Sequence, residues 1–218
     1  SAHARQDVGC HECHGGNPWA VEPREAHRGV LGPSHPSSSV NRVNLASTCS
    51  RCHERNALAF STTLHSTLVQ VDERRAPTCV TCHGVMSARV PAPATLEARC
   101  AACHAAGSAW GAYPALMREA VESLNAQQDR AAALQDAVER LSDYQTRVAM
   151  LRSLHDVRTL LKQAVASVHR IDPRSVADET AAARRRIDAL VELAQFRAEH
   201  RDDAALALER RAGVGLQQ

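Results

Sequence analysis

The chain repeats one short pattern of residues that can carry chemistry, Cys-x-x-Cys-His, four times in its first half. Two thiols three residues apart lie on one turn of a helix. Thiolate and imidazole groups bind metal ions, and thiols also form disulfides and thioethers. The four patterns use all eight cysteines of the chain. They consist of Cys10, Cys13 and His14; Cys49, Cys52 and His53; Cys79, Cys82 and His83; and Cys100, Cys103 and His104.

Other uses of paired cysteines explain this pattern less well. The third and fourth pairs have the spacing of a zinc ribbon, but a site of four thiolates does not use a histidine directly after each second cysteine. Disulfides and thioredoxin-like redox pairs do not need that histidine either. Cys-x-x-Cys-His is the attachment motif of c-type haem, in which both thiols bond to the haem and the histidine binds the iron. The sequence therefore predicts four covalently attached haem c (heme c) groups.

The chain resembles the multihaem c-type cytochromes over residues 1–110. Besides the four motifs, the likeness rests on three short segments: His14-Gly15-Gly16, Leu64-His65-Ser66 and His83-Gly84. This family includes the tetrahaem electron acceptor of hydroxylamine oxidation, partner cytochromes of nitrite reductase, and cytochromes that assemble into filaments. The resemblance implies that most of the haems have two histidine ligands and lie in close pairs.

Four further histidines are needed if every iron has two histidine ligands, and eight are available outside the motif positions. His27 and His65 lie between motifs, where the chain crosses from one haem to the next. His35 lies between Pro33 and Pro36, which restrict the backbone around it. His155 lies on a long predicted helix that could cap a haem. We predict His27, His35, His65 and His155 as the second ligands.

The helical histidines His155 and His169 share one helix face but lie roughly 21 Å apart along the axis, so they cannot bind the same iron. We favour His155, because His169 is near the predicted helix end, where a positive charge suits the helix dipole. The alternative ligands are His3, His11, His169 and the thioether of Met86. We expect His200, in a highly charged stretch, to face solvent.

The composition changes near Gly111. Residues 1–110 hold all cysteines and most prolines and glycines, which indicates loops with short helices. No glycine or proline occurs between Pro114 and Pro173, and apolar residues recur there at helical spacing. One helix of that length would measure on the order of 85 Å. We therefore expect a break near Asn125.

A further helix is predicted from Asp172 and Pro173, an N-cap followed by proline in the first turn, to about Arg211. The predicted fold is mainly α. A loop-rich tetrahaem cytochrome c domain at residues 1–110 is followed by a long α-helical hairpin or three-helix bundle at residues 111–218. Aromatic residues make up only 3% of the chain, which is consistent with haems filling part of the interior.

Charge and hydropathy restrict the partners. The formal net charge is +2, and each haem would add two propionate carboxylates, so nucleic-acid binding is not indicated. No run of about 18 apolar residues is present, so the sequence predicts no membrane span. Cytochrome c haem is attached after export. We therefore expect a periplasmic or extracellular protein, with a signal sequence or an anchor removed ahead of Ser1.

These observations favour an electron-transfer protein of a respiratory chain, and not an enzyme. Its mostly bis-histidine, low-spin haems would carry electrons between unidentified donor and acceptor proteins. An alternative is a small reductase of the nitrite, hydroxylamine or sulfite class, with one five-coordinate haem. Catalytic side chains for it are few, since the chain has two tyrosines and one lysine. Another alternative is a subunit of a cytochrome assembly or filament, with a homo-oligomer formed through the helical domain.

Arginine is by far the more frequent base, and some arginines could bind haem propionates through bidentate hydrogen bonds. The candidates in the first half of the chain are Arg28, Arg42, Arg51 and Arg89.

Overall fold

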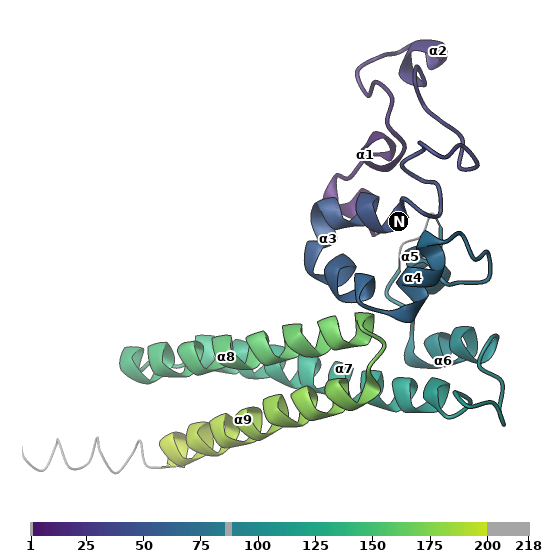
Figure 1. Ribbon diagram of the computed structural model, residues 1–218. Helices are drawn as coiled ribbons and strands as arrows, with labels where there is room; N and C mark the ends of the chain where they lie inside the picture. The colour runs from purple at the N-terminus through teal and green to yellow at the C-terminus, as the bar shows by residue number, and fades with distance from the viewer. Residues whose placement is uncertain (1, 86–88, 200–218) are drawn as a thin grey trace, which may run out of the picture. The chain divides into compact units, whose positions relative to one another are not determined.

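The computed structural model describes residues 2–85 and 89–199, and these residues are mainly α-helical, as predicted, with no strand among them. Figure 1 shows short helices joined by loops, followed by three long helices. None of the helices in the described ranges is both long enough and apolar enough to cross a bilayer. Met86, His200 and the predicted helix end at Arg211 lie outside the described residues. The helices are η1 (Ala4–Gln6), α1 (Cys10–His14), α2 (Pro23–Ala26), α3 (Leu45–Ser61), α4 (Leu64–Gln70), α5 (Cys79–His83), α6 (Pro93–Ala101), α7 (Tyr113–Glu139), α8 (Tyr144–His169) and α9 (Pro173–Glu199).

The chain divides into two compact units. The first contains Ser1–Leu124 and Gln163–Ala177, and the second contains Asn125–Lys162 and the chain from Asp178 onward. The boundary that the composition suggested, near Gly111, lies inside the first unit. The end of α8 and the start of α9 also belong to this unit, together with all four motifs.

The apolar core of the first unit brings α6, the start of α7 and the end of α8 together. Leu96, Met117 and Val121 are buried in one cluster. Four half-buried residues pack against this cluster: Cys82, Cys100, Val168 and Ile171. Two motif cysteines are therefore part of the packing that holds the end of α8 in the first unit.

The second unit is formed by the other parts of the three long helices. Their buried residues recur at helical spacing, as in Leu134 and Val138 of α7 and in Leu154, Val157 and Leu161 of α8. Ion pairs join the helices at their surface. Arg130 of α7 contacts Asp188 of α9 at 2.6 Å, and Arg186 of α9 contacts Asp156 of α8 at 3.3 Å.

The expected break near Asn125 is wrong, because α7 continues through this residue to Glu139. The break lies at residues 140–143, where Asp143 caps the start of α8. The backbone N–H groups of Gln145 and Thr146 donate to its carboxylate oxygens at 3.2 and 3.1 Å. An asparagine inside a helix costs less than 1 kcal/mol, whereas an aspartate cap satisfies free N–H groups. The cap therefore decides where the helix begins.

The predicted start of α9 is confirmed. Asp172 precedes Pro173, and the backbone N–H of Ser175 donates to Asp172 Oδ1 at 3.1 Å. The hydroxyl of Ser175 donates to Asp172 Oδ2 at 2.6 Å. These hydrogen bonds from Ser175 stabilise the carboxylate and hold the pKa of Asp172 below its ordinary value of 3.8.

We predict that Asp172→Ala lowers the free energy of unfolding by about 1 kcal/mol at pH 7, because the cap is lost. Asp172→Asn should lose less, because its amide oxygen still accepts. A lowered folded-state pKa stabilises the fold above the unfolded-state pKa, and this contribution is lost as the pH falls through the folded-state value. The difference between wild type and Asp172→Ala should therefore shrink in acid. Denaturant unfolding followed by circular dichroism measures it, and equal stabilities at pH 7 would contradict the cap.

Candidate functional site

Each motif histidine lies where a regular helix ends or bends. The short helices α1 and α5 contain the first and third motifs and are followed by Gly15 and Gly84, whose φ angles are 77° and 81°. This left-handed backbone favours glycine. Helix α3 bends at His53, where φ is −108° and ψ is 43°, and α6 ends at Ala101, within the fourth motif. The local sequence thus frees each histidine from a continuous helix.

Three of the four motif histidines have the ring of a distant histidine beside them. The ring centres lie 6.1 Å apart for His53 and His3, 5.9 Å for His104 and His65, and 6.1 Å for His83 and His169. The ring planes meet at 46°, 47° and 8°, respectively. Every pair combines one motif histidine with one histidine from another part of the first unit.

This separation fits two imidazoles on opposite sides of one metal ion. A histidine nitrogen lies about 2 Å from a bound metal and the ring centre about 1 Å further, so the two ring centres are about 6 Å apart. Simple aromatic pairs also span about 4.5–7 Å. The repeated combination of one motif ring and one other ring, found three times, favours the metal-ligand arrangement.

The hydrogen bonds of the rings leave one nitrogen free for a metal. The Nδ1 atom of His83 donates to the Arg89 carbonyl oxygen at 3.0 Å, and that of His169 donates to the Val165 carbonyl oxygen at 2.8 Å. A carbonyl only accepts, so Nδ1 carries the proton and Nε2 keeps its lone pair in the neutral ring. Metal-bound histidines are commonly oriented in this way.

Burial favours the neutral form of two of the distant rings. Burial lowers the pKa of His65, and the neighbouring His104 lowers it further. Burial also lowers the pKa of His169, and His83 and His53 lower it further, whereas the bond to the Val165 carbonyl raises it. The neutral imidazole is the form that binds a metal ion.

The first motif has a different arrangement. His14 and His27 both line a cavity of about 390 Å³, together with Cys10. The Nδ1 atom of His27 donates to the Pro23 carbonyl oxygen at 2.7 Å, so Nε2 is again free. Among the described residues, no ring contact like the three above is found for His14.

Gly16 brings the segment that carries His27 close to the first motif. A Cβ atom at Gly16 would lie 2.4 Å from the carbonyl oxygen of Ala26, and φ at Gly16 is 95°. The same carbonyl accepts a hydrogen bond from the backbone N–H of Asn17 at 2.9 Å. Only glycine allows both this backbone and this close approach.

Hydrogen bonds connect the first motif to the second. The side chain of Arg51 in α3 donates to the carbonyl oxygen of Glu12, and Ser39 donates to the carbonyl oxygen of Cys13. Burial raises the pKa of Cys13, and the nearby Cys49 raises it further. The first and second motifs are therefore linked directly through Arg51 and Glu12.

The later motifs also follow one another in space. A hydrogen bond between the thiols of Cys49 and Cys79 raises the pKa of Cys49 and lowers that of Cys79 to about 7. Burial raises the pKa of Cys82, and Cys100 raises it further. The four motifs are thus adjacent in the order in which they occur along the chain.

Arg42 fixes the segment that precedes the third motif. Its guanidinium donates to Asp72 Oδ1 at 3.0 Å and to the carbonyl oxygens of Glu73 and Ala76, both at 2.9 Å. Its side chain is only 26% exposed. The guanidinium of Arg42 is therefore occupied by partners within the protein. The guanidinium of Arg28 is bonded to Glu25, and that of Arg51 to the carbonyl oxygens of Glu12 and Thr48.

In the ranges that the structure describes, no ring contact with a motif histidine is found for His35 or His155, two of the predicted second ligands. The backbone N–H of Ser37 donates to Nδ1 of His35 at 3.1 Å, so the proton of the neutral ring is on Nε2 and no ring nitrogen is free. His155 is exposed in the second unit, which contains no motif. His11 also lines the cavity beside the first motif, but its Nε2 atom lies 3.0 Å from Glu12 Oε1. His3 and His169, predicted from the sequence as alternative ligands, lie beside motif histidines.

The described residues offer pairs of ligands and not larger clusters, since no group of three or more His, Cys, Asp and Glu side chains among them could hold a metal ion. A haem supplies four nitrogens in its plane and needs only two axial ligands from the protein, so paired histidines beside attachment cysteines fit this cofactor. Comparison with protein-family models, curated proteins and solved structures finds no match to the chain.

We predict that Arg42→Ala lowers the free energy of unfolding by about 2 kcal/mol, because a half-buried charged donor and its hydrogen bonds are lost. Arg42→Lys should recover only part of this loss, since an ammonium group cannot reproduce the planar arrangement of donors. Arg55→Ala, an exposed position in α3, serves as the control. Thermal unfolding of the three variants measures the effect, and equal losses at Arg42 and Arg55 would contradict it.

Proposed function

We propose that this chain is a tetrahaem c-type cytochrome that carries electrons between partner proteins outside the cytoplasm. The observation that supports this most strongly is the repeated pairing of a motif histidine with a distant histidine, at the spacing of two axial ligands. Haem bound at the four motifs would supply reversible one-electron chemistry. The protein supplies thioether attachment, axial nitrogens and close spacing.

We assign the ligands from the geometry. His3 pairs with His53, His65 with His104, and His169 with His83. His27 pairs with His14, because both line one cavity and Nε2 of His27 is free. In this assignment His3 and His169 replace His35 and His155.

The adjacency of successive motifs supports electron transfer rather than isolated redox sites. Arg51 of the second motif donates to the Glu12 carbonyl of the first, and Cys49 of the second is hydrogen-bonded to Cys79 of the third. Cys82 of the third motif and Cys100 of the fourth pack against the same apolar cluster. The attachment sites therefore follow one another in space from motif one to motif four. Such a series suits a donor at one end and an acceptor at the other.

A first experiment counts the haems and their ligands. Mass spectrometry of the exported protein should show four covalently bound haems, and electron paramagnetic resonance of the oxidised protein should show low-spin signals for all of them. A chain exported without any covalent haem would contradict the cofactor. Four bound haems with a high-spin signal would instead agree with the cofactor and contradict the assignment of two histidine ligands to every iron.

A matched pair of variants tests the ligand that α8 supplies. We predict that His169→Ala converts one haem of four to a high-spin form that binds cyanide, because His83 loses its partner. His155→Ala removes an exposed histidine from the same helix and should leave the spectrum unchanged. A high-spin haem in His155→Ala, with none in His169→Ala, would restore His155 as the ligand.

A reductase remains the second candidate, and the first motif is where it would act. His14 is the motif histidine for which no ring neighbour is found among residues 2–85 and 89–199, and it borders a cavity of about 390 Å³. A five-coordinate iron there would give one equivalent of high-spin haem that binds nitrite in the wild type. Electron transfer alone predicts no such signal, and a His27→Ala variant that creates it would identify His27 as the ligand.

The proposal of a homo-oligomer or filament is tested with the whole chain. A truncation at residue 110 would remove His169 and the end of α8 from the first unit, so it cannot isolate the helical part. The solution mass of the intact, haem-loaded protein is the suitable measurement, and a monomer at all concentrations would contradict the oligomer.

A further inference from the structure

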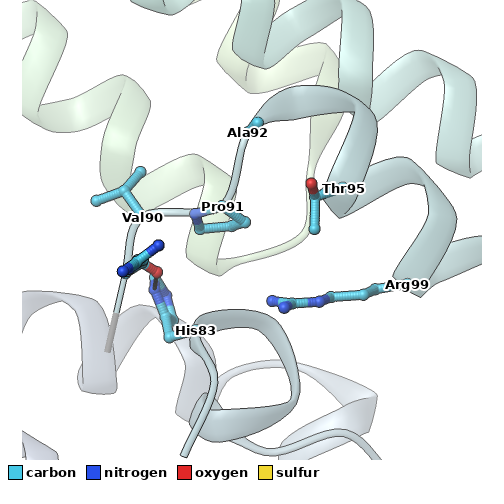
Figure 2. Close-up of a pocket in the computed structure, with 7 residues that line it drawn as sticks. His83, Val90, Pro91, Ala92, Thr95 and Arg99 are labelled. Carbon is cyan, nitrogen blue, oxygen red and sulfur yellow. Dashed lines mark hydrogen bonds between the residues drawn. The ribbon is translucent and has the colours of Figure 1, made fainter. Parts of the chain in front are cut away.

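Two arginines line a cavity of about 310 Å³ beside His83. Arg99 reaches it from α6, and Figure 2 shows its side chain extending across the cavity toward His83. Arg89 reaches it from the segment ahead of α6. Val90, Pro91 and Thr95 also contribute to the wall. No acidic side chain is among the described residues that line this cavity.

The backbone holds Arg89 at a fixed place relative to the His83 ring. Its N–H donates to the carbonyl oxygen of His83 at 2.9 Å, and its own carbonyl accepts the bond from His83 Nδ1 at 3.0 Å. Arg99 is half-buried and lies close enough to Cys82 for its charge to act on that thiol. Both positive charges therefore belong to the surroundings of the third motif.

Neither guanidinium is neutralised within the described part of the chain. Other arginines there have acidic partners, as Arg118 has in Glu97 at 2.9 Å and Arg42 has in Asp72. No ion pair of this kind involves Arg89 or Arg99 among the described residues. Two unpaired guanidinium groups at one cavity form a site for a carboxylate or another oxyanion, which each can bind through two parallel hydrogen bonds.

We propose that Arg89 and Arg99 bind a propionate carboxylate of the haem attached at Cys79 and Cys82, and thereby raise the reduction potential of that haem. This inference rests on the proposed cytochrome function. A positive charge near the iron disfavours the oxidised state, which carries the more positive charge. A propionate paired with arginine also stabilises the oxidised iron less, so both effects raise the reduction potential. Arg99 is the stronger test position, because it is half-buried and Arg89 is exposed.

The experiment is a potentiometric titration of the haem-loaded protein, followed by visible absorption. In Arg99→Gln the equilibrium constant for reduction of one haem should fall about tenfold, which corresponds to about 59 mV for a one-electron couple. Arg89→Gln should shift the same haem in the same direction. Arg99→Lys retains the charge and should shift it less. Arg152→Gln, an exposed arginine of the second unit, should leave all potentials unchanged.

The controls separate the possible failures. Haem stoichiometry and low-spin signals equal to the wild type show that Arg99→Gln keeps its ligands, so the shift reports on charge. Unchanged potentials in Arg99→Gln would overturn the proposal. The proposal would also be overturned if added phosphate shifted the reduction potential of the wild type but not that of Arg99→Gln. Arg89 and Arg99 would then bind a free anion and not the propionate. A wild type without haem would instead refute the cytochrome function.

Discussion

The approach of one motif imidazole to one distant imidazole is the constraint on which the first unit depends. The three ring pairs connect residue 53 to residue 3, residue 104 to residue 65, and residue 83 to residue 169. Polar side chains also hold the loops between the motifs by donating to backbone carbonyls, as Asn44 does to Pro36 and Ser38. Where ligands come from separate segments, binding of the metal centre is coupled to folding.

The motif cysteines have a second structural role. Cys82 and Cys100 pack against the cluster of Leu96, Met117 and Val121, which also receives Val168 beside His169. Two motif cysteines and the residues that position the end of α8 therefore share one core. A substitution in this core would affect both the end of the helix and His169, whereas substitutions around Arg130 and Asp188 concern the second unit alone.

The sequence predicted the parts of this arrangement that depend on local chemistry. The mainly α-helical fold and the start of α9 at Asp172 and Pro173 follow from spacing and capping, and the structure confirms them. The break at residues 140–143 was missed, although Asp143 has the same capping signal as Asp172. The proximity of His3 and His169 to motif histidines could not be predicted, because it depends on tertiary approach. The sequence pattern also did not predict that the Val165 carbonyl orients the His169 ring.

The ring pairs also have an order in time, because a chain is made from its N-terminus and its earlier parts fold first. His3 precedes its partner His53, so this pair can form as soon as the second motif has emerged. His83 must wait until α8 is complete, since its partner His169 is the last residue of that helix. The third motif is thus synthesised early, but the ring that lies beside its histidine is synthesised only when α8 ends.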